Sequence, residues 1–329
     1  MSVNNVLVLL PLSPAQRARL EAGAPEARFV YVADAASGSG LSIDPDAVTS
    51  EQLAEADVIV GNFPPARLAG ATSLRLLQLN SAGYDNYAAA ALPAGLAVAN
   101  AGGAYGQAVS EHMLAMVLAL MKRLPGYCDN QRACAWRDLG PVTSFKGANV
   151  VVLGAGDIGS RFAQLTSGLG ARAVGLRRHA DGPVPAGFAE IRPMDDLYRS
   201  LGEADVIASF LPSAPSTRGL ANAEFFDVCK PGAYFANGGR GDLVVADDLI
   251  AALSSGQLAG AALDVTSPEP LSSDHPLWSA PNVFITPHIS GGFHLPEVLD
   301  NIVDIAVCNL RCLEADEPMR NIVLTGSGC

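Results

Sequence analysis

The feature that most constrains the fold of this chain is an apolar run that leads straight into a glycine-spaced turn. Residues 150–153 are Val-Val-Val-Leu, and an amphipathic segment follows the turn as far as Gly168. The glycines have the spacing GxGxxG: Gly154, Gly156 and Gly159. In a strand–turn–helix unit, the first glycine permits the tight turn, the second lets the backbone approach a diphosphate, and the third lets the helix pack closely on the strand. Since the helix would begin at Asp157 and Ile158, where free N–H groups attract an anion, the sequence predicts a dinucleotide-binding unit of the Rossmann type.

Short apolar stretches alternate with helix-like stretches along the 329 residues, which is the pattern of α/β proteins with parallel, doubly wound sheets. The first series of expected strands covers residues 6–10, 29–32, 58–61 and 76–79. The second series covers residues 149–153, 173–176, 206–209, 233–236, 260–263 and 283–285. Two independent series indicate two domains, and the chain is long enough for each to bury its own core. We expect one domain to comprise residues 1–101 and 290–329, and the other to comprise residues 102–289.

Two long segments are expected to form helices that pack within these domains. Residues 107–124 are largely apolar, but their uninterrupted apolar run is too short to span a bilayer. The final segment, residues 296–314, has apolar side chains at helical spacing and can pack back on the first domain. Near the N-terminus, Ser13 and Gln16 have the spacing of a capping box around a helix that starts at Pro14.

Composition and charge argue against several classes of protein. Charged residues make up 16% of the chain and hydrophobic residues 49%, which is typical of a globular enzyme and not of a disordered protein. The formal net charge of −12 disfavours nucleic acid and anionic membrane surfaces as partners. The N-terminus carries no basic leader and the six cysteines show no CxxC pair, so we expect a cytoplasmic protein without a metal site. Cys308 and Cys312 could share a helix face as a thiol pair or metal half-site, but two buried free cysteines are the simpler interpretation.

The strand expected after the glycine turn, residues 173–176, should end beside the ribose of a bound dinucleotide. In a site selective for NAD, an Asp or Glu at this point binds the ribose hydroxyls, but this chain has Arg177 and Arg178. Two guanidinium groups can hold a ribose 2′-phosphate through charge-assisted hydrogen bonds. We therefore predict that NADP(H) is the preferred cofactor, with NAD(H) as the alternative. The competing interpretation is a solvated basic turn in which an arginine pairs with Asp181.

Three residues in the second half of the chain could carry out acid–base chemistry beside the dinucleotide. They stand next to turn-forming Gly or Pro at expected strand ends: Arg240, Glu269 and His288. Arg240 cannot lose its proton and can hold a carboxylate, while His288 titrates near neutral pH and can donate a proton to a carbonyl oxygen. A carboxylate from Glu269 would keep the imidazole charged, so together the three supply the groups needed to reduce a 2-oxo acid by hydride transfer. Taken singly each could be structural: Arg240 a surface partner of Asp242, and the other two a turn residue and a strand-end histidine.

Two further features leave alternatives open. His112 lies in the long apolar segment, where we expect it to cap or pack. Residues 62–65, Asn-Phe-Pro-Pro, follow the third expected strand and could either face the distal group of a substrate or pack against their own domain.

Several ordered motifs resemble those of the D-isomer-specific 2-hydroxyacid dehydrogenase family, and the likeness covers nearly the whole chain. Residues 211–220 look like the family's LPxTxxTxxL loop, and residues 230–241 look like its KxGAxxxNxxRG segment. Residues 260–270 and 281–291 match the remaining motifs. The resemblance implies an α/β fold of two doubly wound parallel-sheet domains, a flavodoxin-like substrate domain and a Rossmann dinucleotide-binding domain, with the active site in the cleft between them.

The resemblance also implies roles for particular residues. Arg240 would bind the substrate carboxylate and carbonyl, His288 would be the acid/base and Glu269 its partner. One loop would offer backbone N–H groups to the carboxylate: Ser81, Ala82 and Gly83. Asp264 would contact the nicotinamide carboxamide. Further cofactor contacts would come from the motif residues Leu211, Pro212, Thr217, Asn237 and Gly291.

The resemblance finally implies an assembly and an activity. Family members are usually homodimers with the segment around Trp136 near the partner subunit, so we expect a homodimer. The activity implied is NADPH-preferring reduction of a small 2-oxo acid, such as glyoxylate or hydroxypyruvate, to the D-2-hydroxy acid. One alternative is an oxidoreductase similar to 3-phosphoglycerate dehydrogenase, although the first domain shows no clear basic cluster for a substrate phosphate. Another is a nucleotide-sensing binding protein similar to the family's transcriptional corepressors.

Overall fold

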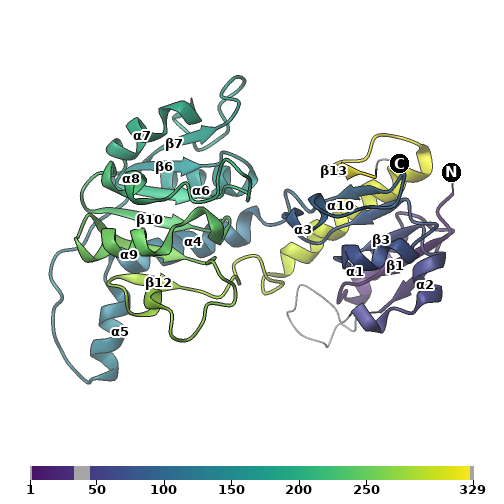
Figure 1. Cartoon of the computed structure of the whole chain (residues 1–329), viewed down its shortest axis with the longest axis horizontal. Helices are drawn as coiled ribbons and strands as arrows, with labels where there is room; N and C mark the ends of the chain where they lie inside the picture. The colour runs from purple at the N-terminus through teal and green to yellow at the C-terminus, as the bar shows by residue number, and fades with distance from the viewer. Residues whose placement is uncertain (1, 33–44, 327–329) are drawn as a thin grey trace. The chain divides into compact units, whose positions relative to one another are not determined.

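The chain folds into two compact units, each built around its own β-sheet with interleaved helices (Figure 1). The computed structural model describes residues 2–32 and 45–326. The first unit comprises Met1–Tyr105 and Gly292–Cys329, and the second comprises Gly106–Gly291. The α/β class and the two doubly wound sheets predicted from the sequence are confirmed. The assignment of one unit to the substrate and the other to the dinucleotide stays a prediction.

The sheet of the first unit has the strand order β13-β5-β4-β3-β1-β2. Its strands are β1 (Asn5–Val8), β2 (Arg28–Tyr31), β3 (Val58–Val60), β4 (Leu76–Gln78), β5 (Ala97–Ala99) and β13 (Ile322–Thr325). All neighbours pair in parallel except β13, which runs antiparallel to β5. Every residue of β3 and β4 is buried, as expected for central parallel strands that are covered on both faces.

The helices of the first unit include one formed by the last part of the chain. They are α1 (Pro14–Glu21), α2 (Ser50–Glu55), α3 (Asp85–Ala88) and α10 (Pro296–Ala315), with 3₁₀ turns at Pro45–Ala47 and Pro65–Gly70. The capping box predicted for α1 is confirmed, because the Ser13 hydroxyl accepts from Gln16 N at 3.4 Å and Gln16 Oε1 accepts from Ser13 N at 3.0 Å. The yellow helix α10 packs against α1, where Gln16 also donates to Asp300 at 3.0 Å (Figure 1).

The sheet of the second unit is entirely parallel and has the strand order β12-β11-β10-β9-β6-β7-β8. Its strands are β6 (Asn149–Leu153), β7 (Arg172–Arg177), β8 (Glu190–Pro193), β9 (Val206–Ser209), β10 (Ala233–Asn237), β11 (Leu258–Leu263) and β12 (Val283–Ile285). The chain adds β7 and β8 on one side of β6 and then adds β9 to β12 on the other. In sheets of this kind, ligands bind outside the carboxyl ends of the strands at that reversal. The edge strand β8 was not predicted, because its sequence Glu-Ile-Arg-Pro lacks an apolar run.

The helices of the second unit follow the predicted alternation with one correction. They are α4 (Gly106–Met121), α5 (Leu124–Arg132), α6 (Asp157–Gly168), α7 (Leu197–Glu203), α8 (Ala223–Asp227) and α9 (Ala246–Ser254), with 3₁₀ turns at Met194–Asp196, Gly241–Leu243 and Pro276–Ser279. The helix predicted over residues 107–124 is confirmed as α4, although it ends at Met121, three residues before the predicted end. The following helix α5 was not predicted: Arg123 adopts a left-handed conformation at φ 56° between the two helices, and Pro125 lies in the first turn of α5. Among the helices in the described part of the chain, none is long and apolar enough to cross a membrane.

The core of the second unit fixes the strands from which the candidate site is built. Three buried aromatic side chains meet edge to face with ring centroids 5.3–6.1 Å apart: Phe225, Phe226 and Phe235. They join a cluster that includes Val151 of β6, Ile207 of β9 and Leu263 of β11. Since close-packed interiors resist deformation, the loops at the carboxyl ends of these strands start from fixed points.

Candidate active site

The glycine-spaced turn joins β6 to α6 and leaves open space at the start of the helix. Gly154 has a positive φ of 95°, and a Cβ there would lie 3.2 Å from a backbone oxygen of the loop after β9. At Gly159 a Cβ would collide with the carbonyl oxygen of Gly154, so only glycine lets the helix pack this closely. A Cβ at Gly156, the N-cap of α6, would meet nothing within 4 Å. The first turn, which begins at Asp157, therefore forms an accessible helix N-terminus of the kind that binds a diphosphate.

The two arginines at the end of β7 differ in what they contact. Nη2 of Arg177 donates to the carbonyl oxygens of Asp181 at 3.1 Å and Pro183 at 3.4 Å. The contact with Asp181 is thus to its backbone and not to its carboxylate. Arg178 is exposed. Arg177 therefore holds the turn that follows β7, while the guanidinium of Arg178 is available to an anion from solvent.

His288 and Glu269 form a hydrogen-bonded pair in the loops that follow β12 and β11. Nδ1 of His288 lies 2.8 Å from Oε2 of Glu269, and the other carboxylate oxygen of Glu269, Oε1, accepts from Thr266 N at 2.9 Å. Since an ionised carboxylate only accepts hydrogen bonds, Nδ1 carries the proton in this contact. The other ring nitrogen, Nε2, is left for a reacting group.

This pairing shifts the pKa of both groups toward their charged forms. The hydrogen bond with Glu269, helped by the negative charges of Glu269 and Asp264, raises the pKa of His288 above its ordinary value, against partial burial and the charge of Arg240, which lower it. Burial raises the pKa of Glu269, but the hydrogen bonds from His288 and from the Thr266 N–H, together with the positive charges of His288 and Arg240, lower it overall. The arrangement therefore keeps an imidazolium against a carboxylate over a wider pH range than an isolated histidine would show.

Asp264, directly after β11, holds the backbone on both sides of His288. Its Oδ1 accepts from the Thr286 hydroxyl at 2.6 Å and from Ile289 N at 3.1 Å. Its Oδ2 accepts from Ser290 N at 3.1 Å and from the Ser290 hydroxyl, and its carbonyl oxygen accepts from His288 N at 2.7 Å. His288 has a φ of 51°, which non-glycine residues adopt rarely and which surrounding contacts must maintain. Because Asp264 is almost fully buried, its carboxylate acts as a fixed anchor for this loop.

Arg240 follows β10 in a turn that packs against the loop after β11. Its Nη1 donates to the carbonyl oxygen of the preceding residue at 2.8 Å, and the Asn237 side chain closes the turn by donating to Arg240 O at 2.8 Å. A Cβ at Gly241 would collide with the carbonyl oxygen of Thr266. The positive charge of Arg240 is one of the influences on the pKa of both Glu269 and His288. The structure therefore brings together the three charged residues that the sequence singled out.

The loop after β9 lies between the glycine turn and the Arg240 turn. Thr217 Oγ1 donates to Pro212 O at 2.8 Å and accepts from Ala214 N at 2.9 Å, which closes this loop on itself. A Cβ at Gly239 would lie 2.5 Å from the carbonyl oxygen of Leu211. Gly291, the last residue of the second unit, directly follows the anchored Ser290.

A pocket of about 400 Å³ lies beside the His288–Glu269 pair. Its polar wall residues are Asp264, Thr266, Glu269, Thr286 and His288. Its apolar wall residues are Pro270, Leu271, Trp278, Ile285 and Pro287. Polar groups set among apolar side chains are typical of small-molecule sites, so the pocket can hold a small ligand against the His288–Glu269 pair.

In the first unit, the loop after β4 makes three backbone N–H groups available. Its carbonyl oxygens are all occupied: Ser81 O accepts from Ala101 N at 2.9 Å, Ala82 O from Asn100 Nδ2 at 2.7 Å, and Gly83 O from the Ser81 hydroxyl at 2.6 Å. Within residues 2–32 and 45–326, the N–H groups of these three loop residues have no protein acceptor. Successive free N–H groups attract anions, so the loop can accept a carboxylate.

Residues 62–65 begin with two residues that are held within the first unit. Asn62 N donates to Asn80 Oδ1 at 2.6 Å, and Asn62 Oδ1 accepts from Asn80 N at 3.2 Å and from the Ser81 hydroxyl at 3.3 Å. Phe63 is buried, and the Tyr87 hydroxyl contacts both its backbone N and its backbone O. Of the two interpretations of this segment, packing against its own domain therefore describes Phe63, while Asn62 braces the loop after β4.

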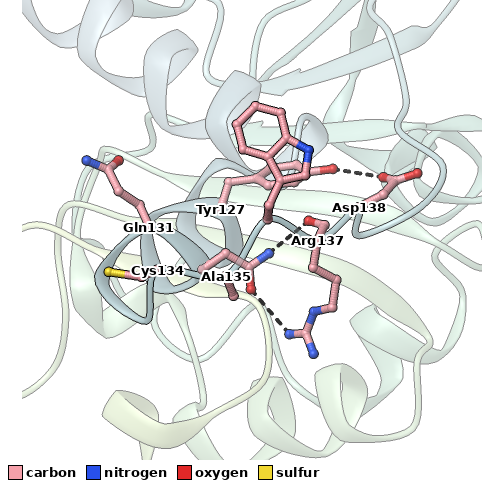
Figure 2. Close-up of a pocket in the computed structure, with 8 residues that line it drawn as sticks. Tyr127, Gln131, Cys134, Ala135, Arg137 and Asp138 are labelled. Carbon is pink, nitrogen blue, oxygen red and sulfur yellow. Dashed lines mark hydrogen bonds between the residues drawn. The ribbon is translucent and has the colours of Figure 1, made fainter.

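A second pocket, of about 610 Å³, lies at α5 and the segment that follows it (Figure 2). The Tyr127 hydroxyl donates to Asp138 at 3.0 Å, and the side chains of Asn130 and Arg137 hydrogen-bond at 3.2 Å. Trp136 on the same segment is fully exposed. None of the predicted catalytic residues lines this pocket, so it is separate from the His288–Glu269 pair.

Two side chains next to the His288 loop were missed by sequence reasoning: Thr286 and His112. Nε2 of His112, on α4, lies 3.0 Å from Thr286 Oγ1. The two residues are 174 positions apart, and no local pattern in a sequence signals such a contact. The only available signal for Thr286 was its place two residues before His288.

Comparison with known proteins finds relatives over nearly the whole chain. A family model described as "D-isomer specific 2-hydroxyacid dehydrogenase, NAD binding domain" matches residues 114–290. Glyoxylate/hydroxypyruvate reductase A of Serratia proteamaculans is 35% identical over 66% of this chain and 67% of its own length. The solved structure of a D-isomer specific 2-hydroxyacid dehydrogenase family protein of Aeromonas salmonicida has 31% identity and a TM-score of 0.83, with 98% of this chain and 99% of that chain covered. An NADPH-dependent glyoxylate/hydroxypyruvate reductase of Sinorhizobium meliloti, in complex with NADP and sulfate, has 25% identity and a TM-score of 0.78, with 97% and 98% covered.

Proposed function

Because the chain belongs to the D-isomer-specific 2-hydroxyacid dehydrogenase family, we propose that it reduces a small 2-oxo acid with NADPH as its preferred donor. As a member of that family it is an NAD(P)-dependent oxidoreductase. The proposed substrates are glyoxylate and hydroxypyruvate, and the proposed product is the D-2-hydroxy acid. The observation that carries the proposal is the 2.8 Å contact between His288 Nδ1 and Glu269, since it leaves a charged imidazole with Nε2 free to donate a proton. The names of the Serratia and Sinorhizobium relatives support this substrate class.

His288 is the proposed acid/base of the reaction. When bound, the reduced nicotinamide supplies the hydride, and negative charge then develops on the carbonyl oxygen of the substrate. Nε2 of His288 donates its proton to that oxygen, and Glu269 stabilises the imidazolium before the transfer. In the oxidation direction the same nitrogen removes the hydroxyl proton, so a neutral imidazole is required.

Two parts of the chain are proposed to bind the substrate carboxylate. Arg240 is permanently charged and can hold a carboxylate while it polarises the neighbouring carbonyl. The loop after β4 offers backbone donors: Ser81, Ala82 and Gly83. Their carbonyl oxygens are already occupied, so the free N–H groups can bind an anion with little reorganisation.

The turn between β6 and α6 fits a dinucleotide diphosphate, because the N-cap of the helix is open at Gly156. Beyond the glycine turn, the residues proposed to contact the cofactor are Leu211, Pro212, Thr217, Asn237, Asp264 and Gly291. Arg178 is the proposed ligand of the ribose 2′-phosphate because it is exposed, whereas Arg177 orients the turn through backbone carbonyls. The Sinorhizobium relative, which is named as NADPH-dependent, supports this cofactor preference.

A homodimer formed through the segment around Trp136 is the proposed assembly. Trp136 is fully exposed and lines the pocket at α5, and exposed large aromatic side chains are enriched in protein interfaces. Light scattering on the full chain measures the molar mass in solution. Twice the chain mass of 33.9 kDa supports the proposal, and a single-chain mass contradicts it.

The loss of reduced-cofactor absorbance with a panel of 2-oxo acids tests the proposed function. NADPH and NADH are compared in parallel, and kcat/KM is measured for each acid. We expect turnover of glyoxylate or hydroxypyruvate with NADPH favoured. No turnover of any 2-oxo acid contradicts the activity, and a tenfold or greater advantage of NADH contradicts the cofactor preference.

A further inference from the structure

A histidine on α4 reaches the loop that carries His288. Nε2 of His112 lies 3.0 Å from Thr286 Oγ1 and 3.7 Å from Asp264 Oδ1. The helix packs on α6, β10 and β11, so the position of His112 is fixed by the core of the second unit. A contact between a packed helix and a strand-end loop can transmit that rigidity to the loop.

The directions of these hydrogen bonds follow from the protons available. Thr286 has one hydroxyl proton, and its strongest acceptor is Asp264 Oδ1 at 2.6 Å. The other acceptor within reach, the thioether of Met116 at 3.5 Å, is weak. With its proton given to Asp264, Thr286 Oγ1 can only accept from His112, so Nε2 of His112 is the donor. His112 thereby fixes which way the threonine hydroxyl points.

Asp264 passes this constraint on to the backbone around His288. Its side chain accepts from the N–H groups of Ile289 and Ser290, and its carbonyl oxygen accepts from His288 N. His288 needs such support because its backbone is in the left-handed region at φ 51°. A loosened Asp264 would therefore release His288 from its alignment with Glu269.

We propose that His112 is a positioning residue for His288, acting by donating to Thr286 and so holding the Asp264 carboxylate on the loop backbone. In this proposal His112 acts on His288 through Thr286 and Asp264 and not by contact with the substrate. The inference rests on the proposed function, in which His288 is the acid/base.

The pKa of His288 reports whether His112 holds the loop, because this pKa depends on the charged groups around the imidazole. The charged groups that influence the pKa of His288 are Glu269, Asp264 and Arg240, and His112 faces Asp264 from α4. Removing His112 leaves these charges in the chain but frees the loop that aligns them. The pKa of His288 should then move toward its ordinary value, because its hydrogen bond with Glu269 is the largest influence that raises it.

The test compares His112→Phe, which removes the donor and keeps a ring, with His112→Gln, which keeps a donor. We expect His112→Phe to lower kcat for 2-oxo acid reduction about tenfold, with the KM for NADPH within about twofold of wild type. His112→Gln should recover most of the loss. Thr286→Val should lower kcat similarly, and the double variant should be no worse than the poorer single variant, since both changes break the same chain. A His112→Phe kcat within about twofold of wild type, or single losses that multiply in the double variant, overturns the proposal.

An NMR titration of the histidine side chains separates this inference from the proposed function, because it needs no turnover. The pKa of His288 should be lower in His112→Phe than in wild type, and an unchanged His288 pKa overturns the positioning role. Absence of wild-type turnover would contradict the proposed function while leaving this titration decisive. Should His112→Phe fail to fold, His112→Gln and Thr286→Val carry the same comparison. His275→Asn is the matched control, since the ring of His275 accepts from Leu277 N at 3.2 Å and is not part of the chain from His112 to His288, and it should leave the His288 pKa unchanged.

Discussion

Two strand-end loops of this molecule make chemical groups available in opposite ways. The loop after β4, residues 81–83, leaves its backbone N–H groups free while its carbonyl oxygens are bound by neighbouring groups. The loop after β12 leaves the imidazole of His288 available while its backbone is bound by Asp264. In the first loop the anchor is the side chain of Asn100, and in the second it is a buried carboxylate.

This difference indicates which residues of each loop are sensitive to substitution. A loop that binds through N–H groups tolerates changes in its own side chains but depends on the residue that orients its backbone. A loop that acts through a side chain depends on that side chain, on its charge partner and on the residues that hold its backbone. The second unit should therefore show larger single-residue effects on the rate than the first unit shows.

Among the substitutions that test this difference between the two units, Arg240→Ala is expected to have the largest effect on the rate. Loss of this permanently charged side chain, the proposed ligand of the substrate carboxylate, should lower kcat/KM for the 2-oxo acid by more than about a hundredfold. The matched control is Arg199→Ala, which removes an exposed ion pair with Glu203 on α7 and should change kcat/KM by less than about twofold. Near-normal turnover of Arg240→Ala would remove this residue from the mechanism.

The two arginines at the end of β7 show the same contrast between holding the backbone and binding a ligand. Arg177 binds backbone carbonyl oxygens, while Arg178 is exposed. Arg178→Ala should raise the KM for NADPH about twentyfold, the scale of a lost charge-assisted contact, and leave the KM for NADH unchanged. Arg177→Ala should mainly lower the melting temperature. Equal effects of Arg178→Ala on both cofactors would show that this arginine does not recognise the 2′-phosphate.

A smaller effect is expected in the first unit for Asn100→Ala. Without the 2.7 Å hydrogen bond to Ala82 O, the loop should relax, and the KM for the 2-oxo acid should rise about fivefold with little change in kcat. Ala82→Ser changes a side chain of the loop itself and should keep KM within about twofold. If Ala82→Ser proves as damaging as Asn100→Ala, the loop does not act through its backbone.

Local patterns in the sequence predicted much of this fold. The glycine spacing at residues 154–159 and the apolar runs marked the β6–α6 unit and most strands, because a strand–turn–helix signature lies within a few neighbouring residues. The helix α4 was predicted to within three residues of its end, whereas the short helix α5 that follows it was not predicted. The edge strand β8 was missed because polar edge strands carry little apolar signal.

The candidate site was predictable as a set of residue types but not as a network. The motifs in the sequence singled out Arg240, Glu269 and His288 as candidates, whereas the contact from His112 to Thr286 depends on the packing of α4 against β11. The role of Arg177 as a brace for its own turn depends on the path of the backbone through Asp181. Such contacts depend on tertiary structure, so they cannot be predicted from local patterns in a single sequence.

The pH dependence of kcat/KM for 2-oxo acid reduction, compared between wild type and Glu269→Gln, tests the central claim most directly. In the proposed mechanism reduction needs a protonated His288, so its rate is full below the His288 pKa and falls as pH rises through that pKa. Glu269 raises this pKa, whereas a glutamine can still accept from Nδ1 but carries no charge. We predict that in Glu269→Gln the fall in the reduction rate shifts to lower pH. The rise in the oxidation rate with pH should also shift to lower pH, because both follow the pKa of His288. A fall that keeps its wild-type position would contradict the claim that Glu269 holds His288 in its proton-donating form.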